Sequence, residues 1–306
     1  MKHLLNLIRW KNLLLLIIAQ VLIKYGLFNS FHAETLLTTL QFSMLIMATI
    51  CIAAAGNVIN DIYDVETDTI NKPNKVIVGK HVSEKFAFNL FIALNVVGVA
   101  LGFYLSNTIG RSGFAVLFVI VSALLYMYST YFKYLFFIGN LVVSSLISLS
   151  ILIVGLFELV PTMNSLNQVV HKGILQILLI YAVFAFVLNI IREIIKDIED
   201  INGDHKAEMK TLPIVIGRER ATMIAFTISL LPIFGLIYII VQSFYKYQLA
   251  LIYLLIFLLG PLIYITIKLF SAERKIEYQH ISAMLKIVML FGVLSLLLYP
   301  LVINNA

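Results

Sequence analysis

The sequence carries little charge and a single cysteine. Asp, Glu, Lys and Arg together make up 12% of its 306 residues, whereas soluble domains carry roughly 25%. This scarcity excludes an ordinary water-soluble protein, and no low-complexity tract or separate soluble domain stands apart in the sequence. The one cysteine, Cys51, lies inside an apolar stretch, which excludes an intrachain disulfide and indicates a small packing residue.

Long hydrophobic stretches take the place of the missing charge. Hydrophobic residues make up 61% of the chain, and runs of about 20 apolar residues, each able to cross a bilayer core of ~30 Å, recur along its whole length. We therefore expect an all-α, polytopic membrane protein with a single transmembrane domain over 1–306. The predicted spans cover residues 10–28, 37–60, 86–106, 113–131, 136–157, 173–196, 221–243, 248–269 and 281–303.

Lysine and arginine are divided unevenly between the two sides that these spans define. If the N-terminus is cytoplasmic, 18 of the 22 fall on that side, as the positive-inside rule requires. The opposite side receives Lys24, Arg111, Lys172 and Lys246. The formal net charge of +6 is therefore interpreted as membrane topology, and we expect no nucleic-acid partner. The two longest connections, about 61–85 and 197–220, fall on the cytoplasmic side.

The acidic residues gather in two short segments. Four of the 16 lie within 61–68 and six within 193–208. These segments follow the second and the sixth predicted spans, so both emerge on the same side of the membrane. Within each, residues three or four apart share one helical face if the preceding span continues past the membrane surface. The residues on these faces are Asn57, Asn60, Asp64 and Asp68 in the first segment, and Asp197, Asp200 and Asp204 in the second.

Carboxylates in these positions are unfavourable unless a cation binds between them. Like charges four residues apart on a helix repel each other, and the dipole at a helix C-terminus disfavours anions. Oxygen ligands one helical turn apart suit Mg²⁺. Lysines follow both segments, Lys72 and Lys75 after the first and Lys206 and Lys210 after the second. Metal ions with lysines close by are what a metal-bridged phosphate needs. Either segment alone could instead be a solvated loop.

Two motifs resemble a known family. Residues 60–68 read NDIYDVETD, an NDxxDxxxD pattern, and residues 200–204 read DINGD, a DxxxD pattern. With about 130 residues between them and nine spans, they resemble the UbiA superfamily of intramembrane prenyltransferases over nearly the whole chain. Shorter matches are RWKN at 9–12, with Trp where proline is usual, NKPNK at 71–75, YMYS at 126–129, and Lys133 followed by Gly139 and Asn140.

The resemblance implies a fold and a reaction. It implies two pseudo-symmetric four-helix halves plus a ninth helix, with two Mg²⁺ ions holding a prenyl diphosphate beneath a cytoplasmic cap. The metal ligands would be Asn60, Asp64 and Asp68 for one ion, and Asp200 and Asp204, with Asp197 on the same face, for the other. The substrate-binding residues would be Asn12, Asn57, Lys72, Lys75, Lys133, Lys210, Arg192, Tyr126, Tyr128 and Asn189. Tyr126 and Tyr128 could instead be packing residues, and Asn189 either faces the cavity or forms a hydrogen bond between helices.

The acceptor is less well specified by the sequence. Residues 192–213 look most like the digeranylgeranylglyceryl phosphate synthase branch, which implies geranylgeranyl transfer to geranylgeranylglyceryl phosphate. Glu208 departs from that branch, since glycine is usual there; it either alters the site or points to water. Polyprenyl transfer to an aromatic acceptor such as 4-hydroxybenzoate is the alternative. A cation transporter would place acidic residues at the centre of several spans, and here they lie at one surface. No obligate protein partner is implied.

Overall fold

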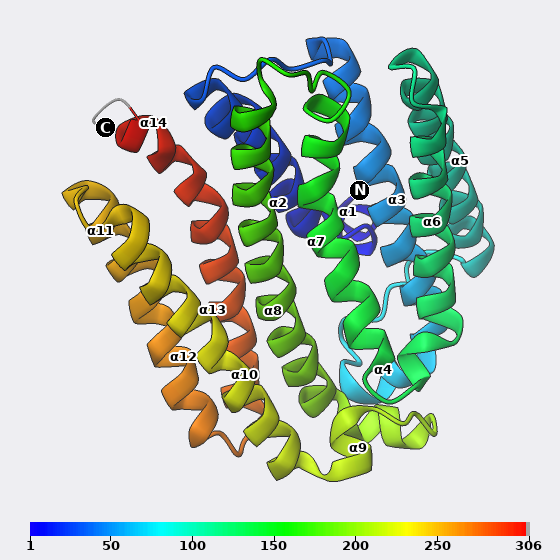
Figure 1. The fold of residues 1–306 in the computed structure, drawn as a ribbon. Helices are drawn as coiled ribbons and strands as arrows, with labels where there is room; N and C mark the ends of the chain where they lie inside the picture. The colour runs from blue at the N-terminus through cyan, green and yellow to red at the C-terminus, as the bar shows by residue number, and fades with distance from the viewer. Residues whose placement is uncertain (304–306) are drawn as a thin grey trace.

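The computed structural model describes residues 1–303, and these residues form a bundle of helices without a β-strand (Figure 1). Within them, nine helical segments are long and apolar enough to cross a membrane. They extend over Trp10–Phe28, Thr39–Tyr63, Glu84–Thr108, Ser112–Thr130, Ile138–Glu158, Gln168–Lys206, Arg218–Phe244, Gln248–Phe270 and Lys275–Ile303. The predicted all-α fold and all nine predicted spans are confirmed.

Among the described residues, four of the nine spanning segments are single α-helices, and the other five combine α-helix with short stretches of π- or 3-10 helix. A short helix α1 (Lys2–Leu7) precedes the bundle. The long helices are α2 (Trp10–Val21), α3 (Thr39–Tyr63), α5 (Glu84–Thr108), α6 (Ala115–Thr130), α7 (Ile138–Glu158), α8 (Gln168–Lys206), α10 (Arg218–Ile239), α12 (Gly260–Phe270) and α13 (Lys275–Leu294). The short ones are α4 (Val65–Asn71), α9 (Leu212–Ile216), α11 (Gln248–Leu254) and α14 (Tyr299–Ile303).

Local sequence explains where two of the helices begin. Thr38 and Gln41 form a capping box at the start of α3, in which the Gln41 amide N–H donates to the Thr38 hydroxyl at 3.3 Å. The Thr38 amide N–H in turn donates to the Gln41 side chain at 2.9 Å. Ser83 accepts a hydrogen bond from the Phe86 N–H and so caps α5. Such caps satisfy backbone donors that a helix leaves without partners at its first turn.

The sixth spanning helix extends far beyond its apolar stretch. The sequence predicts a span over 173–196, whereas α8 runs for 39 residues, about 58 Å at 1.5 Å per residue. This length exceeds the bilayer core of ~30 Å, so its charged end projects beyond it. The predicted loop at 197–220 is therefore partly helix, and so is the one at 61–85, where α3 ends at Tyr63 and α4 follows directly.

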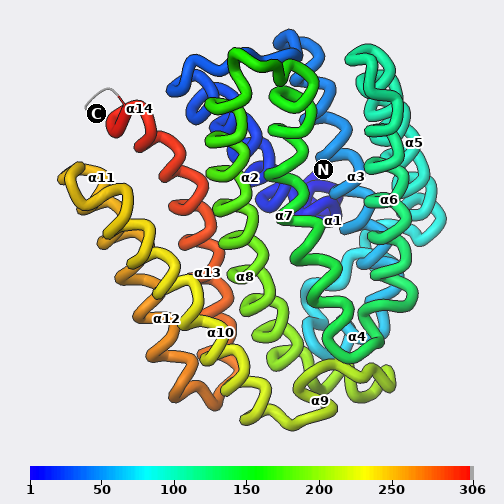
Figure 2. Tube along the Cα trace, in the orientation of Figure 1, coloured from blue at the N-terminus to red at the C-terminus, as the bar shows by residue number. Residues whose placement is uncertain are grey.

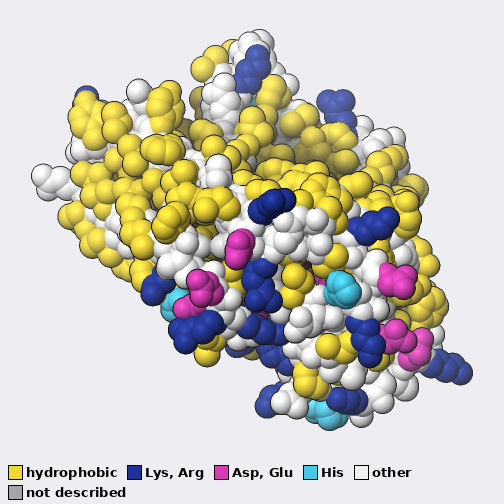
Figure 3. Space-filling model, turned by 90° about the horizontal axis from the view of Figure 1, so that it is seen from below, with side chains coloured by type: hydrophobic (Ala, Val, Ile, Leu, Met, Phe, Trp, Pro, Cys, Tyr) yellow, Lys and Arg dark blue, Asp and Glu magenta, His cyan; other side chains and the backbone are white. Residues whose placement is uncertain are grey.

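Close packing joins the bundle and leaves one face polar. A Cβ added to Gly98 of α5 would lie 2.6 Å from the Ile52 side chain and 3.1 Å from the Ala48 carbonyl oxygen of α3, so only glycine permits this approach. Helix α8 packs against α7, α10 and α13. At one end of the bundle, α4 packs against the end of α8 near α9 (Figure 2). Charged side chains gather on this end, bordered by hydrophobic ones (Figure 3).

Candidate active site

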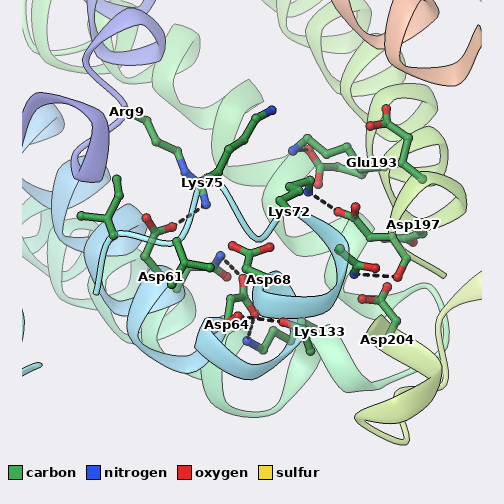
Figure 4. A pocket seen from close by; sticks show the side chains of 18 of the residues that line it. Arg9, Asp61, Asp64, Asp68, Lys72, Lys75, Lys133, Glu193, Asp197 and Asp204 are labelled. Carbon is green, nitrogen blue, oxygen red and sulfur yellow. Dashed lines mark hydrogen bonds and ion pairs between the residues drawn. The ribbon is translucent and has the colours of Figure 1, made fainter. Parts of the chain in front are cut away.

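A cavity of about 780 Å³ opens at the polar end of the bundle. It is lined by residues of α1–α4, α6–α8 and α13 and by the chain that follows α4 and α8, and both acidic segments face into it (Figure 4). Twelve of the residues singled out in the sequence line it: Asn12, Asn60, Asp64, Asp68, Lys72, Lys75, Tyr128, Lys133, Arg192, Asp197, Asp200 and Asp204.

The other four residues singled out in the sequence lie elsewhere. Asn57 and Asn189 line a second, largely apolar cavity of about 350 Å³ that extends into the bundle. Asn189 also donates to the Ser144 hydroxyl at 3.1 Å, so it both faces that cavity and bonds to a neighbouring helix. Tyr126 and Lys210 are exposed and line neither cavity. The Tyr126 ring stacks on Phe91, which is a packing contact.

In the first acidic segment the side chains are held by nitrogen donors. Asp64 lies where α3 gives way to α4, with φ −94° and ψ 2°, and accepts hydrogen bonds from the Asn60 amide and the Lys133 ammonium. Asp61 also lines the cavity and pairs with Arg9 at 2.8 Å. Burial, followed by repulsion from Asp64, raises the pKa of Asp68 to about 6. A bound cation would favour ionised Asp68.

The second acidic segment is held from outside its own helix. Asp200 pairs with Lys72 of the chain following α4, and Asp197 accepts from the Asn140 amide at 2.8 Å. Burial alone would lower the pKa of Lys72, but Asp200 raises it above its ordinary value. Asp204 is buried and forms no ion pair with the residues that the structure describes. The lysine that follows the first segment in sequence thus neutralises a carboxylate of the second.

Asn71 fastens the two segments together. Its side-chain amide donates to the Asp200 carbonyl oxygen at 2.8 Å and accepts from the Gly203 N–H at 2.9 Å. The approach is so close that a Cβ on Gly203 would lie 2.4 Å from Asn71 Nδ2 and 2.7 Å from the Thr67 carbonyl oxygen. The Gly-Asp pair at 203–204 therefore serves two purposes, because the glycine admits α4 and the aspartate faces the cavity.

The donor atoms around the cavity fit a divalent cation that arrives with its phosphate. Among residues 1–303 no three Asp, Glu, His or Cys side chains gather closely enough to enclose an ion. Four buried oxygens of residues lining the cavity nevertheless form no hydrogen bond in the described part of the chain: Asn60 Oδ1, Glu199 Oε1, Asp200 Oδ1 and Thr211 Oγ1. Mg²⁺ prefers oxygen ligands and commonly takes only one or two carboxylates, with water and substrate phosphate completing its shell.

Several charged residues of the cavities escaped the sequence analysis as site residues. Arg9, Lys196 and Lys286 line both cavities, and Glu193 accepts from Lys196 at 2.6 Å and from Arg192 at 3.2 Å. The available signal for Lys286 was a single charge in the midst of an apolar run on the ninth span. Glu208 is exposed, lines neither cavity and has a φ of +56°, the left-handed region that favours glycine.

A family model and a sequence relative match this chain. The model described as the UbiA prenyltransferase family matches residues 13–280. A digeranylgeranylglyceryl phosphate synthase of Methanosphaera stadtmanae is 32% identical over 247 residues, which cover 79% of this chain and 80% of that protein. The chain is therefore similar in sequence to a prenyltransferase along most of its length.

Two solved structures share the fold. One reported for digeranylgeranylglyceryl phosphate synthase in membranes has a TM-score of 0.62 at 24% identity, covering 100% of this chain and 99% of that chain. A UbiA homologue from Archaeoglobus fulgidus, bound to DMAPP and Mg²⁺, has a TM-score of 0.58 at 16% identity, covering 96% of this chain and 98% of that chain. The chain belongs to the UbiA prenyltransferase family and is a prenyltransferase built from membrane-spanning helices.

Proposed function

We propose that this enzyme transfers a geranylgeranyl group from geranylgeranyl diphosphate to geranylgeranylglyceryl phosphate, forming an ether lipid in a Mg²⁺-dependent reaction. The observation that carries the proposal is the pairing of two cavities. The polar cavity and the apolar one share the lining residues Arg9, Asn12, Arg192, Glu193, Lys196 and Lys286. A diphosphate in the first can therefore have its prenyl chain in the second.

The acidic segments and their lysines suit a diphosphate. Two Mg²⁺ ions, one per segment, would supply positive charge that stabilises the departing diphosphate. Asn60, Asp64 and Asp68 would hold one, and Asp200 and Asp204, with Asp197 behind them, the other. Lys72 and Lys133 now pair with Asp200 and Asp64, and a metal on those carboxylates would free both ammonium groups to bind phosphate oxygens. Lys75 is already without an ion pair among the described residues.

The apolar cavity suits the reacting carbon. In the reaction the bond between C1 of the prenyl group and its diphosphate oxygen breaks, and the electron pair leaves with the diphosphate. The acceptor hydroxyl forms a new bond from its oxygen to C1, and its proton leaves with the diphosphate. An allylic cation reacts readily with water, so walls such as Leu13, Leu125 and Leu188 would protect it. The Tyr128 ring lines the polar cavity, where an aromatic face can stabilise positive charge.

The proposal includes an orientation, with the polar cavity and the N-terminus on the cytoplasmic side. Its support is the division of Lys and Arg, 18 of 22 of which fall on that side. The native Cys51 is buried, so single new cysteines at Lys206 and Lys172 can be labelled in intact cells with an impermeant maleimide. Labelling is expected only at position 172, and labelling of position 206 instead would reverse the orientation.

The test of function is a transfer assay on purified enzyme. Radiolabelled geranylgeranyl diphosphate and Mg²⁺ are offered with geranylgeranylglyceryl phosphate, 4-hydroxybenzoate or 1,4-dihydroxy-2-naphthoate in parallel. We expect a labelled ether lipid only with the glyceryl phosphate, and its loss on adding EDTA. A labelled aromatic product instead would keep the prenyl donor and overturn the acceptor.

A further inference from the structure

Positive charge is concentrated where the polar cavity meets the apolar one. Four cations line both cavities at this junction: Arg9, Arg192, Lys196 and Lys286. Glu193 is the one acidic residue among the described residues that line both. The junction thus differs from the rest of the polar cavity, where aspartates outnumber the lysines that contact them. Such a cluster of cations favours a bound anion.

Its internal ion pairs leave charge uncompensated. Arg9 is neutralised by Asp61, and Arg192 and Lys196 both donate to Glu193. Within residues 1–303, Lys286 makes no hydrogen bond or ion pair; Arg192 and Arg9 repel it, and Glu193 attracts it. The three cations Arg192, Lys196 and Lys286 thus have one carboxylate beside them, Glu193, which pairs with the first two and leaves two positive charges in excess. Arg192 Nε is also buried without an acceptor, so the cluster lacks both negative charge and hydrogen-bond acceptors.

Lys286 lies at the boundary between the polar cavity and the apolar one. On α13, the residues Ser282, Lys286, Met289 and Val293 are three or four apart and form one helical face. Ser282 lines only the polar cavity, whereas Met289 and Val293 line only the apolar one. Lys286 lines both. An anion held here would lie beside an apolar wall, which suits the headgroup of a lipid whose chain enters that wall.

We propose that Lys286, with Arg192 and Lys196, binds the phosphate of the acceptor, a phosphate monoester of a prenylated glycerol; this inference rests on the proposed function. A phosphate monoester carries about −1.5 to −2 charges near neutral pH, which matches the excess of two positive charges. An aromatic carboxylate carries a single negative charge and would leave the cluster unbalanced. The donor diphosphate would have its own partners at Lys72, Lys75 and Lys133, which line the polar cavity and not the apolar one.

The donor and the acceptor both carry phosphate groups that a lysine can bind. The experiment therefore measures a separate KM for each substrate. Lys286→Met keeps the apolar stem and removes the charge, and Lys286→Arg restores the charge. The control is Lys268→Met, an exposed lysine at the end of α12 that lines neither cavity. We expect Lys286→Met to raise the KM for geranylgeranylglyceryl phosphate about tenfold, as befits one charged hydrogen bond, while the KM for geranylgeranyl diphosphate stays unchanged.

The control variants and the two KM values together test the proposed role of Lys286. Lys286→Arg and Lys268→Met should keep an acceptor KM within about threefold of wild type, since a tenfold change is the mark of a lost charged contact. A rise in the donor KM instead, or no change in either KM, would overturn the inference while leaving the proposed function intact.

A wild-type enzyme that forms no ether product would refute the proposed function. Equilibrium binding of labelled geranylgeranylglyceryl phosphate, without donor or Mg²⁺, then tests the inference independently. Binding that Lys286→Met weakens supports the phosphate site, and binding that is absent or unaffected refutes it.

Discussion

The two acidic segments look alike in sequence and are built differently. The first lies across a bend, since α3 ends at Tyr63 and α4 begins at Val65. The second lies on the unbroken end of α8, which continues to Lys206. The first segment is thus divided between two helices that meet at Asp64, whereas the second is carried by one continuous helix. The carboxylates of the first segment therefore come from two helices and those of the second from one.

Each segment also depends on the other for its partners. Lys72 and Asn71 follow the first segment in sequence, yet they bond to Asp200 and Gly203 of the second. Lys133, from the turn between α6 and α7, holds Asp64. The two acidic segments are therefore two halves of one site, and a substitution in either segment should disturb the side chains of the other.

The largest effect is expected from removing one carboxylate of either segment. Asp64→Asn and Asp204→Asn should each lower kcat/KM by about 10²–10³-fold or more, because the charge developing on the departing diphosphate loses its support. The matched control is Glu66→Gln, since Glu66 belongs to the first segment but is exposed and lines neither cavity. Near-normal turnover in either Asp variant would break the claim of one shared site.

A smaller effect is expected where the segments touch. Gly203→Ala places a Cβ against Asn71 and the Thr67 backbone, and such overpacking costs about 1–3 kcal/mol. Both turnover and melting temperature should fall. Gly173→Ala on the same helix meets nothing within 4 Å, so it should be neutral or gain up to about 1 kcal/mol from helix propensity. Equal behaviour of the two variants in a thermal melt would argue against tight contact between α4 and α8.

The lysines that follow the two segments should also differ. Lys75 lines the polar cavity and Lys210 does not. Lys75→Ala should therefore raise the KM for the prenyl diphosphate about tenfold through one lost charge-assisted hydrogen bond. Lys210→Ala should change this KM less than about threefold. Steady-state kinetics at saturating acceptor measure both, and similar tenfold rises in the two variants would contradict the structure and restore the prediction from sequence that both lysines bind phosphate.

The smallest effect concerns the turn after the second segment. Glu208 has a left-handed backbone, which costs a non-glycine residue about 1–2 kcal/mol. Glu208→Gly should therefore raise the free energy of unfolding by about 1 kcal/mol and leave turnover unchanged, because the side chain lies outside the cavities. Loss of activity in this variant would show that the carboxylate serves the site.

The fold could be predicted from sequence because each span is a continuous apolar stretch, and because the lysines and arginines between the spans fall mainly on one side of the membrane. All nine spans were predicted, but several of their ends differ from those in the structure. The predicted span ends at Lys196, yet α8 continues for ten residues, since its charged face lines a cavity and contacts α4. Periodicity alone does not distinguish such a helix from a solvated loop.

The site was predicted where its chemistry repeats along the chain. The carboxylates at four-residue spacing were visible, whereas pairings across distant segments, such as Lys72 with Asp200 and Lys133 with Asp64, were not. Lys286 carried no local motif, because its place beside both cavities follows from the packing of α13 against α8. Lys210 and Tyr126 were named from short matches, and in the structure both side chains are exposed, Lys210 after the end of α8 and Tyr126 on α6.

The most direct test of a single shared site is donor binding measured against Mg²⁺ concentration. Labelled geranylgeranyl diphosphate would be titrated onto the purified enzyme in lipid nanodiscs, with Mg²⁺ varied and no acceptor present. The account predicts binding that requires Mg²⁺ and is weakened in both Asp64→Asn and Asp204→Asn. Binding that is independent of Mg²⁺, or that one of these variants retains in full, would contradict it.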